Sequence, residues 1–185
     1  EQYNFDALNI PKNHPSRDMQ DTLWVHTHKR FLMRTQTSPV QIRYMEKHLP
    51  PFQIIVPGRV FRNEATDASH EINFYQCEGL AVGSDISLAH FKYIIEKFLH
   101  RMFGQTIKIR YRPSYFPFVE PGLEIDVFYR GQWLEIMGAG MVHPHVFEYA
   151  HYNPHEWQGF AFGVGLDRIA MIKYNIPDIR LFYSG

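Results

Sequence analysis

The residue types best suited to chemistry lie within one stretch of the sequence, Gly58–Gly83. Two β-rich runs, Gly58–Asn63 and Ile72–Val82, flank the polar segment Glu64–Glu71. The segment is too hydrophilic to be a strand, and each run has a strand-like composition. The stretch therefore predicts an antiparallel hairpin with a long loop.

This hairpin would bring together side chains that suit a nucleotide. Side chains alternate between the two faces of a strand, so Phe74, Gln76 and Glu78 are predicted to share one face. Arg62 ends the first run, has Glu64 two residues on, and carries a guanidinium that can fork onto a phosphate. The aromatic ring can stack on a base, the guanidinium can bind a phosphate, and the polar groups can bind an amine. Together they predict a nucleotide site. The alternative is a solvated strand with an ordinary surface ion pair.

A helix start supplies a second candidate binding site. Phe31–Gln36 is typical of a strand, and Ser38 followed by Pro39 predicts an N-cap with proline at the first helical position. The helix is expected to run to Pro50. Its free N-terminal amides, together with the Ser38 hydroxyl, are suited to an anion such as a substrate carboxylate.

Aromatic residues and glycines suggest how a pocket is walled. Phe116 and Phe118 lie between prolines in a segment expected to be extended, so both rings face the same way and can wall a pocket for an aromatic group. Two ordinary core rings are the alternative. Gly138 and Gly140 are expected to let a ligand approach the backbone. The single cysteine, Cys77, is interpreted as a small strand residue and not as a nucleophile.

Composition narrows the class of protein. A chain of 185 residues with 45% hydrophobic and 16% aromatic residues fits one domain with a real core and excludes a disordered chain. No apolar run reaches the length of a membrane span, and the acidic, polar start is not expected to act as a signal peptide. A single cysteine fits a reducing cytoplasm. The net charge is zero, because there are 19 lysines plus arginines and 19 aspartates plus glutamates. If the protein binds RNA, most contacts to the RNA are therefore expected from other parts of the protein.

Other segments predict the helices and strands that surround these residues. Ser84-Asp85 is expected to cap a helix whose apolar stripe stops at Gly104. Thr106–Arg112 alternates as a strand that Pro113 is expected to end. Leu123–Tyr129 and Gln132–Met137 predict an antiparallel pair turned at Arg130-Gly131. Gly159–Tyr174 predicts a strand running into a helix, with Arg168 in the first turns of the helix.

Several of these strings resemble one known family. GRVFRNEATDASHE is similar to the second signature motif of class II aminoacyl-tRNA synthetases, which has a Phe-Arg-x-Glu core. Five further strings in register resemble the phenylalanyl-tRNA synthetase α-subunit family: FDALNIPKNHPSRDMQDT, RTQTSPVQIR, YFPFVEPG, GAGMVHP and GFAFGVGLDRIAM. The resemblance implies an α+β fold, a mainly antiparallel sheet of six or seven strands flanked by helices. Residues 1–185 are expected to form one catalytic domain.

The resemblance also implies an activity. Phenylalanine is activated with ATP and Mg²⁺ to phenylalanyl-adenylate, and the phenylalanyl group is then transferred to the 3′ end of phenylalanine tRNA. Arg62 matches the α-phosphate ligand and Arg168 the γ-phosphate ligand, the two residues implied to be catalytic. ATP contacts are implied at Arg62, Glu64, His70, Phe74 and Arg168. His70 as a solvated loop residue stays an alternative.

Amino-acid and metal contacts follow from the same resemblance. Amino-acid contacts are implied at Gln36, Ser38, Gln76, Glu78, Phe116, Phe118 and Ala161. Gln36 departs from the family, which has histidine there, and this departure bears on amino-acid affinity and identity. Glu120 matches a ligand of a magnesium ion shared with a β subunit, and Glu135 matches a ligand of the magnesium ion that accompanies ATP.

The resemblance implies partners and leaves rival functions open. The partners are tRNA and a β subunit in an α2β2 heterotetramer. The long helix of the first class II motif is not in the sequence, so the chain is expected to be truncated at both ends. A non-catalytic paralogue with a binding or regulatory role is one alternative, favoured by Gln36. A class II ligase for another amino acid is the other, opposed by Phe116, Phe118 and Ala161.

Overall fold

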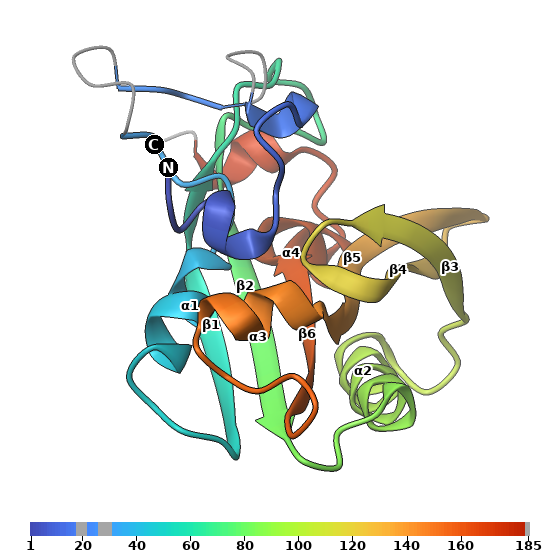
Figure 1. The fold of residues 1–185 in the computed structure, drawn as a ribbon. Coiled ribbons are helices and arrows are strands. Elements are labelled where there is room, and N and C mark those ends of the chain that lie inside the picture. The colour runs from blue at the N-terminus through green and yellow to red at the C-terminus, as the bar shows by residue number, and fades with distance from the viewer. Residues whose placement is uncertain (18–21, 26–30, 184–185) are drawn as a thin grey trace.

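The computed structural model describes residues 1–17, 22–25 and 31–183; residues 18–21, within the first family-like string, lie outside the described residues. Six antiparallel strands form one sheet in the order β1-β2-β6-β5-β4-β3 (Figure 1). The strands are β1 (Phe52–Phe61), β2 (Asn73–Gly83), β3 (Ile109–Phe116), β4 (Val119–Tyr129), β5 (Gln132–Val142) and β6 (Gln158–Gly165). The predicted α+β class and antiparallel sheet are confirmed.

In the part of the chain that the structure describes, four α-helices and three short 3-10 helices accompany the sheet. The α-helices are α1 (Pro39–Met45), α2 (Leu88–Phe103), α3 (Pro144–Tyr149) and α4 (Leu166–Tyr174), and the 3-10 helices are η1 (Asp6–Leu8), η2 (Pro15–Arg17) and η3 (Ile179–Phe182). Among the helices of residues 1–17, 22–25 and 31–183, none is long and apolar enough to cross a membrane.

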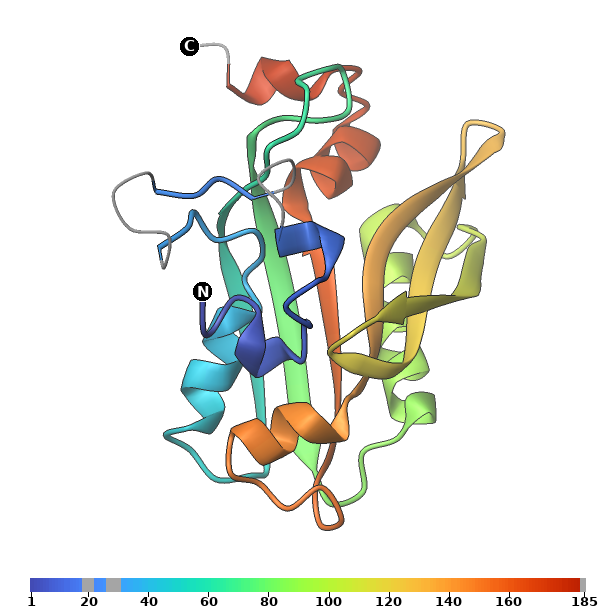
Figure 2. The ribbon, with the colours of Figure 1, turned by 45° about the horizontal axis from the view of Figure 1, so that its top comes forward.

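The helices make two cores, one on each face of the sheet. On one face, η1, α1 and α3 pack over the inward side chains of β2, including Leu80 and Val82 (Figures 1 and 2). On the other face, α2 contributes Phe91, Ile95 and Leu99, all 0% exposed, to a second core beneath β4, β5 and β6. The first face is also the face of the predicted nucleotide residues, because Phe74, Gln76 and Glu78 alternate in phase with Leu80.

The predicted hairpins are confirmed. β1 pairs with β2 antiparallel, with Phe61 opposite Asn73, and the polar loop follows; β1 begins earlier than expected, at Phe52. β4 and β5 pair across Arg130 (φ 49°) and Gly131 (φ 84°). Two successive positive φ angles are characteristic of the type I′ turn, whose twist matches that of the strands it joins. The expected strand-to-helix passage is confirmed as β6 and α4.

Four predicted boundaries are wrong, each for a local reason. Phe31–Gln36 is not a strand; its only β-bridge in the described residues joins Leu32 to Trp24. α1 starts at Pro39 as expected but ends at Met45, and Ser38 makes no side-chain capping bond. Ser87, not Ser84, caps α2 by accepting the His90 N–H. β3 runs through Pro113 because it is an edge strand, where proline costs no bond to a second neighbour.

Candidate active site

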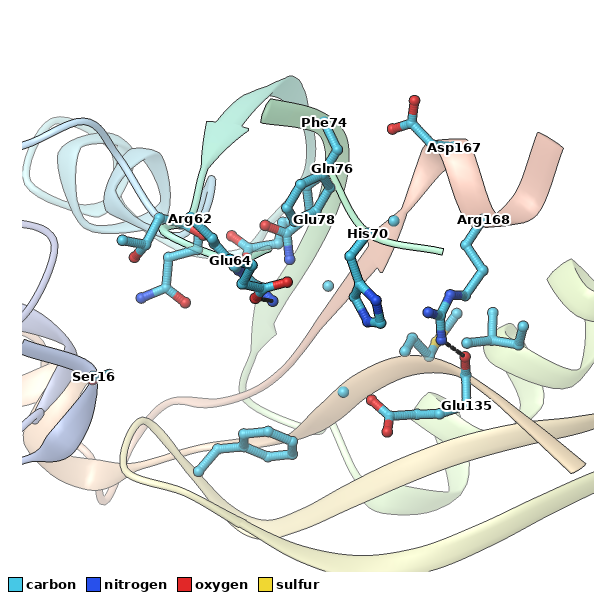
Figure 3. Close-up of a pocket in the computed structure, with 18 of the residues that line it drawn as sticks. Ser16, Arg62, Glu64, His70, Phe74, Gln76, Glu78, Glu135, Asp167 and Arg168 are labelled. Atoms are coloured by element: carbon cyan, nitrogen blue, oxygen red, sulfur yellow. Dashed lines mark hydrogen bonds and ion pairs between the residues drawn. The ribbon is translucent and has the colours of Figure 1, made fainter. Parts of the chain in front are cut away.

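A cavity of about 620 Å³ opens on the face of β2 that carries the predicted nucleotide residues (Figure 3). Its walls come from β2, the β1–β2 loop, the β3–β4 turn, β5 and the start of α4. Eleven of the fourteen candidate residues line it: Gln36, Arg62, Glu64, His70, Phe74, Gln76, Glu78, Phe116, Phe118, Glu135 and Arg168. A sheet can gather residues this far apart in sequence because neighbouring antiparallel strands bring their side chains to one face.

The β1–β2 loop forms one end of the cavity. The Arg62 guanidinium carbon lies 5.1 Å from the centroid of the Phe74 ring, a cation–π distance. Its Nη1 is 3.8 Å from Glu64 Oε1, and both side chains are partly exposed. A weak 3.5 Å bond from Nε to the Thr35 carbonyl leaves much of the guanidinium available to a ligand. A ring, a cation and a carboxylate therefore face the same space, as the alternation of β2 predicts.

Glu78 forms the buried end of the cavity. The residue is 4% exposed, accepts a hydrogen bond from the Ser38 hydroxyl, and accepts a 3.1 Å bond from Gln41 Nε2. Burial raises the pKa of its carboxyl to about 7, although both hydrogen bonds favour the ionised form. Removing the carboxylate from water is the larger effect, so a cation brought beside Glu78 would be held strongly.

Gln76 provides a second sign that a donor belongs here. Its Oε1 is buried and has no hydrogen-bond partner within the described part of the chain. A buried acceptor without a partner is costly, so such atoms commonly await a ligand or water. Gly163 on β6 makes room for this arrangement, because a Cβ there would lie 2.9 Å from Gln76 Nε2 and 3.3 Å from Glu78 Oε1. An unpaired amide oxygen beside a buried carboxylate suits an ammonium group.

Arg168 and Glu135 form the wall opposite the β1–β2 loop (Figure 3). Arg168 Nη1 donates a 3.1 Å hydrogen bond to the Glu135 backbone carbonyl, which orients the guanidinium beside the cavity. Burial and the negative charge of Glu124 raise the pKa of the Glu135 carboxyl. A cation placed between these carboxylates would relieve their repulsion.

This donor set fits a magnesium ion held mainly by a substrate. No group of three or more His, Cys, Asp or Glu side chains in residues 1–17, 22–25 and 31–183 is placed to hold a metal by itself. Mg²⁺ commonly binds through one or two carboxylates while waters and phosphate oxygens fill its other positions. Glu135, one of several carboxylates on the cavity wall, can serve as such a ligand.

Phe116 and Phe118 lie side by side, but not on an extended backbone. Their ring centroids are 6.0 Å apart with an interplanar angle of 28°, and both rings line the cavity. Pro117 and Phe118 form the turn between β3 and β4, so the expected extended segment is wrong. The pair of rings arises from the turn instead.

Gly138 and Gly140 both make room for neighbouring parts of the protein. A Cβ on Gly138 would lie 2.9 Å from the Phe116 ring, and a Cβ on Gly140 would lie 2.3 Å from the Pro121 carbonyl oxygen. Gly138 still lines the cavity, because the Phe116 ring that it accommodates forms part of the wall. The expectation of a ligand approach is wrong for Gly140, which does not line the cavity, and it stays a prediction for Gly138.

Three candidate residues lie off the cavity wall. Ser38 is 1% exposed beneath it and bonds to Glu78. Ala161 is 6% exposed in the core against which Phe116 and Phe118 pack. Glu120 is at the surface, where its Oε2 lies 3.4 Å from His143 Nε2, so the two candidate metal ligands do not share one site.

The sequence prediction missed two polar residues that hold the site together. Gln41 is buried on α1 and reaches Glu78, and Asp167 is buried beside Arg168. Gln41 lies one turn after Ser38, a spacing that places both on one helix face, but only the fold shows that this face meets β2. Cys77 fits its prediction, since it lies half-buried on the opposite face of β2 and burial raises the pKa of its thiol.

Comparison with known proteins agrees with the observed fold class. A family model described as tRNA synthetases class II core domain (F) matches residues 1–185. A protein from Petrotoga mobilis named phenylalanine–tRNA ligase alpha subunit is 50% identical over 194 residues, covering 98% of this chain and 56% of that protein. Proteins of the same name from Synechocystis sp. (52% identical; 98% of this chain, 54% of theirs) and Thermotoga neapolitana (54% identical; 97% and 55%) are similar.

These matches have one limit and one consequence. The chain spans about half the length of the curated relatives, 56% of the first, so they bear directly on this domain and not on a whole protein. The family model, in contrast, covers every residue of the chain. With its six-stranded antiparallel sheet and the cavity on one face, the chain belongs to the class II tRNA synthetase core domain family.

Proposed function

We propose that this chain is the catalytic core of a ligase that activates phenylalanine with ATP and transfers it to the 3′ end of phenylalanine tRNA. One observation carries the proposal. The buried Gln76 Oε1 without a partner and the buried Glu78 carboxylate lie in the same cavity as the Phe116 and Phe118 rings. An ammonium group joined to an aromatic side chain satisfies both ends, and the relatives named phenylalanine–tRNA ligase alpha subunit support this choice.

The first step is a displacement at phosphorus. An oxygen of the amino-acid carboxylate bonds to the α-phosphorus of ATP, the bond from that phosphorus to the β-phosphate oxygen breaks, and pyrophosphate leaves. The carboxylate is already ionised at neutral pH, so no general base is required. Catalysis then consists of aligning the two groups and stabilising the charge that develops. Arg62 is proposed to hold the α-phosphate and Arg168 the γ-phosphate.

The remaining ATP and metal contacts follow the cavity walls. Phe74 is proposed to stack on adenine, Glu64 to accept from its amine, and His70 to contact phosphate. Mg²⁺, when bound, would neutralise phosphate charge, and Glu135 is the carboxylate placed to hold it. In the second step the terminal ribose hydroxyl attacks the aminoacyl carbonyl carbon, the ester forms, and AMP leaves.

The whole-protein roles are part of the proposal. The partners are tRNA and a β subunit in an α2β2 heterotetramer that works in the cytoplasm. The exposed Glu120 is proposed to hold a magnesium ion shared with that β subunit. Ser38 and Ala161 are proposed to act from beneath the cavity, Ser38 through Glu78 and Ala161 by leaving space for the phenyl ring.

A second candidate is a class II ligase for a different amino acid. Gln36 supports it, because this side chain lines the cavity and donates a long hydrogen bond, 3.4 Å, to the Asn4 carbonyl. Glutamine can donate and accept but cannot become a cation, unlike the histidine of the resembling family.

The test is amino-acid-dependent exchange of labelled pyrophosphate into ATP, with this chain alone and with its partner subunit. Exchange that requires phenylalanine is expected. Exchange that prefers another amino acid would favour the second candidate. Silence in both preparations, while ATP still raises the melting temperature, would contradict a catalytic role and favour a binding paralogue.

A further inference from the structure

Residues 4–9 cross the end of the cavity that is proposed to hold the amino acid. Phe5 lines the cavity within this segment, and Ile10 lines it just beyond. Figure 2 shows the segment in blue, with α1 on one side of it and the β3–β4 turn on the other. An asparagine stands at each end, Asn4 and Asn9. We call residues 4–9 the asparagine spacer.

Asn4 holds the loop that carries Gln36. The residue is 5% exposed, its Nδ2 donates a 3.0 Å hydrogen bond to Thr35 Oγ1, and its Oδ1 accepts a 3.3 Å bond from the Thr35 N–H. Its backbone carbonyl accepts the 3.4 Å bond from Gln36 Nε2. These bonds tie one end of the asparagine spacer to the segment just before Ser38, which bonds to the buried Glu78.

Asn9 holds the turn between β3 and β4. Its Nδ2 donates a 2.7 Å hydrogen bond to the Pro117 carbonyl. A carbonyl oxygen only accepts, so the NH2 group must face Pro117, and the amide oxygen is left to accept from His145 Nδ1, 3.3 Å away. The next carbonyl of the turn, that of Phe118, accepts a 3.0 Å bond from the His143 N–H. Both carbonyls of the turn are thus held from outside the β3–β4 pair.

The core keeps the asparagine spacer from yielding. Phe5, Ala7 and Leu8 are each 1% exposed, in the core that η1 forms with α1 and α3. Asn9 ends η1 with a φ of 56°, a left-handed conformation that asparagine adopts more readily than most residues other than glycine. Because protein cores are closely packed, a segment anchored in this way keeps its two ends at a fixed separation.

We propose that the asparagine spacer sets the length of the amino-acid side chain that the cavity accepts. This inference rests on the proposed function, which places an ammonium group near Glu78 and a phenyl ring beside Phe116 and Phe118. A pocket whose two ends are held at a fixed separation fits one number of methylenes between these groups. Neither Asn4 nor Asn9 lines the cavity, so both are positioning residues that act through the segments they hold.

The test compares three amino acids that differ by one methylene: phenylglycine, phenylalanine and homophenylalanine. Asn9→Gly keeps the left-handed backbone, which glycine adopts freely, and removes only the side chain. Asn9→Asp keeps the shape of the side chain but replaces the donor with a carboxylate that the Pro117 carbonyl repels. Asn4→Ala releases the other end of the asparagine spacer.

Asn175→Gly is the matched control. Asn175 also has a left-handed backbone, with a φ of 57°, and it also ends a helix, α4. Its Oδ1 accepts a 3.2 Å hydrogen bond from the Tyr129 hydroxyl, and neither residue lines the cavity. The control therefore removes a comparable side chain with no tie to either end of the proposed amino-acid site.

Each variant is made in the complete protein with its partner subunit. Pyrophosphate exchange gives kcat and KM for each amino acid and the KM for ATP. The rise in melting temperature with each amino acid reports binding without catalysis, because a ligand that binds only the folded state stabilises it.

The expected result is a change in the ranking of the three amino acids. The wild type prefers phenylalanine to the other two by about tenfold or more. In Asn9→Gly and Asn9→Asp the KM for phenylalanine rises about threefold to tenfold, the range that one hydrogen bond spans. The preference over homophenylalanine narrows by a similar factor, because the turn can then move outward, and Asn4→Ala narrows it as well. The KM for ATP stays at its wild-type value, and Asn175→Gly keeps the wild-type ranking.

Three results would overturn the inference. One is a wild-type ranking in both Asn9 variants, and the second is an equal rise in the KM for phenylalanine and for ATP, which would mean general damage to the fold. The third is a wild type whose melting temperature rises equally with all three amino acids or with none. A wild type that phenylalanine stabilises selectively but that never catalyses exchange would contradict the proposed function instead. The ranking of melting temperatures in Asn9→Gly would then still decide whether the asparagine spacer sets the length.

Discussion

The backbone N–H of Tyr75 donates a 2.6 Å hydrogen bond to the side chain of Asp167, which ties the start of β2 to the first turn of α4. The other carboxylate oxygen accepts a 2.7 Å bond from the Tyr183 hydroxyl, and Asp167 is 8% exposed. Asp167 thus fixes the spacing of two neighbours, Phe74 and Arg168, which are proposed to hold opposite ends of ATP.

Replacing Asp167 with alanine should weaken ATP binding selectively. The change leaves the Tyr75 N–H and the Tyr183 hydroxyl without their acceptor, and it frees α4 to shift relative to β2. We expect the KM for ATP to rise about tenfold, equivalent to roughly 1.4 kcal/mol, with the KM for phenylalanine unchanged. Tyr183→Phe, which removes one of the two bonds, should give a smaller rise. Equal increases for both substrates would point to general damage to the fold.

The raised pKa of Glu78 predicts how stability changes with pH. Its folded-state pKa of about 7 exceeds the ordinary value of 4.5, so between these values the folded protein keeps a proton that the unfolded chain has released. Stability contributed by this group is full below the unfolded pKa and is lost as pH rises through 7. The loss amounts to about 3 kcal/mol by pH 8.

Glu78→Gln removes this titration and isolates its effect. We expect the variant to melt at a higher temperature than the wild type at pH 8, with the difference shrinking toward pH 5. The same variant should lose amino-acid binding, because the ammonium then has no carboxylate. A difference in melting temperature between the two proteins that stays constant from pH 5 to pH 8 would contradict the raised pKa of Glu78.

The sequence predicted which side chains share one strand face better than it predicted the contacts between separate elements of the site. The alternation of Phe74, Gln76 and Glu78 was enough to place three side chains on one face, because a strand has only two faces. The side-chain role of Ser38 was missed, because a hydroxyl at a helix start can cap the helix or bond to another element, and only the packing of α1 against β2 decides between them. Pro113 and Gly140 were misread for the same reason, since edge position and strand contact are properties of the assembled sheet.

Gly138→Ala should raise the KM for the amino acid and leave the KM for ATP unchanged. The added Cβ would lie 2.9 Å from the Phe116 ring, so this part of the cavity wall must shift. We expect a rise of about tenfold in the KM for phenylalanine and a loss of stability of about 1–3 kcal/mol from overpacking. Gly83→Ala is the control, because the nearest atom to its added Cβ is 3.4 Å away, an ordinary contact. An unchanged KM in the first variant would mean that the Phe116 ring does not meet the amino acid.

Arg62→Ala and Arg168→Ala should each slow adenylate formation by about a hundredfold to a thousandfold, the usual cost of removing one donor from developing charge. The two guanidiniums come from opposite walls of the cavity and have different supports. Arg62 lies 5.1 Å from the Phe74 ring, and Arg168 bonds to the Glu135 carbonyl.

Loss of Arg62 should lower kcat with little change in the KM for ATP, because the α-phosphorus is the reacting centre. Loss of Arg168 should raise that KM as well, because the far phosphate is bound before and during reaction. Arg101→Ala, at the exposed end of α2, is the matched control and should leave exchange unchanged. Near-normal rates in either cavity variant would refute the phosphate role proposed for that arginine.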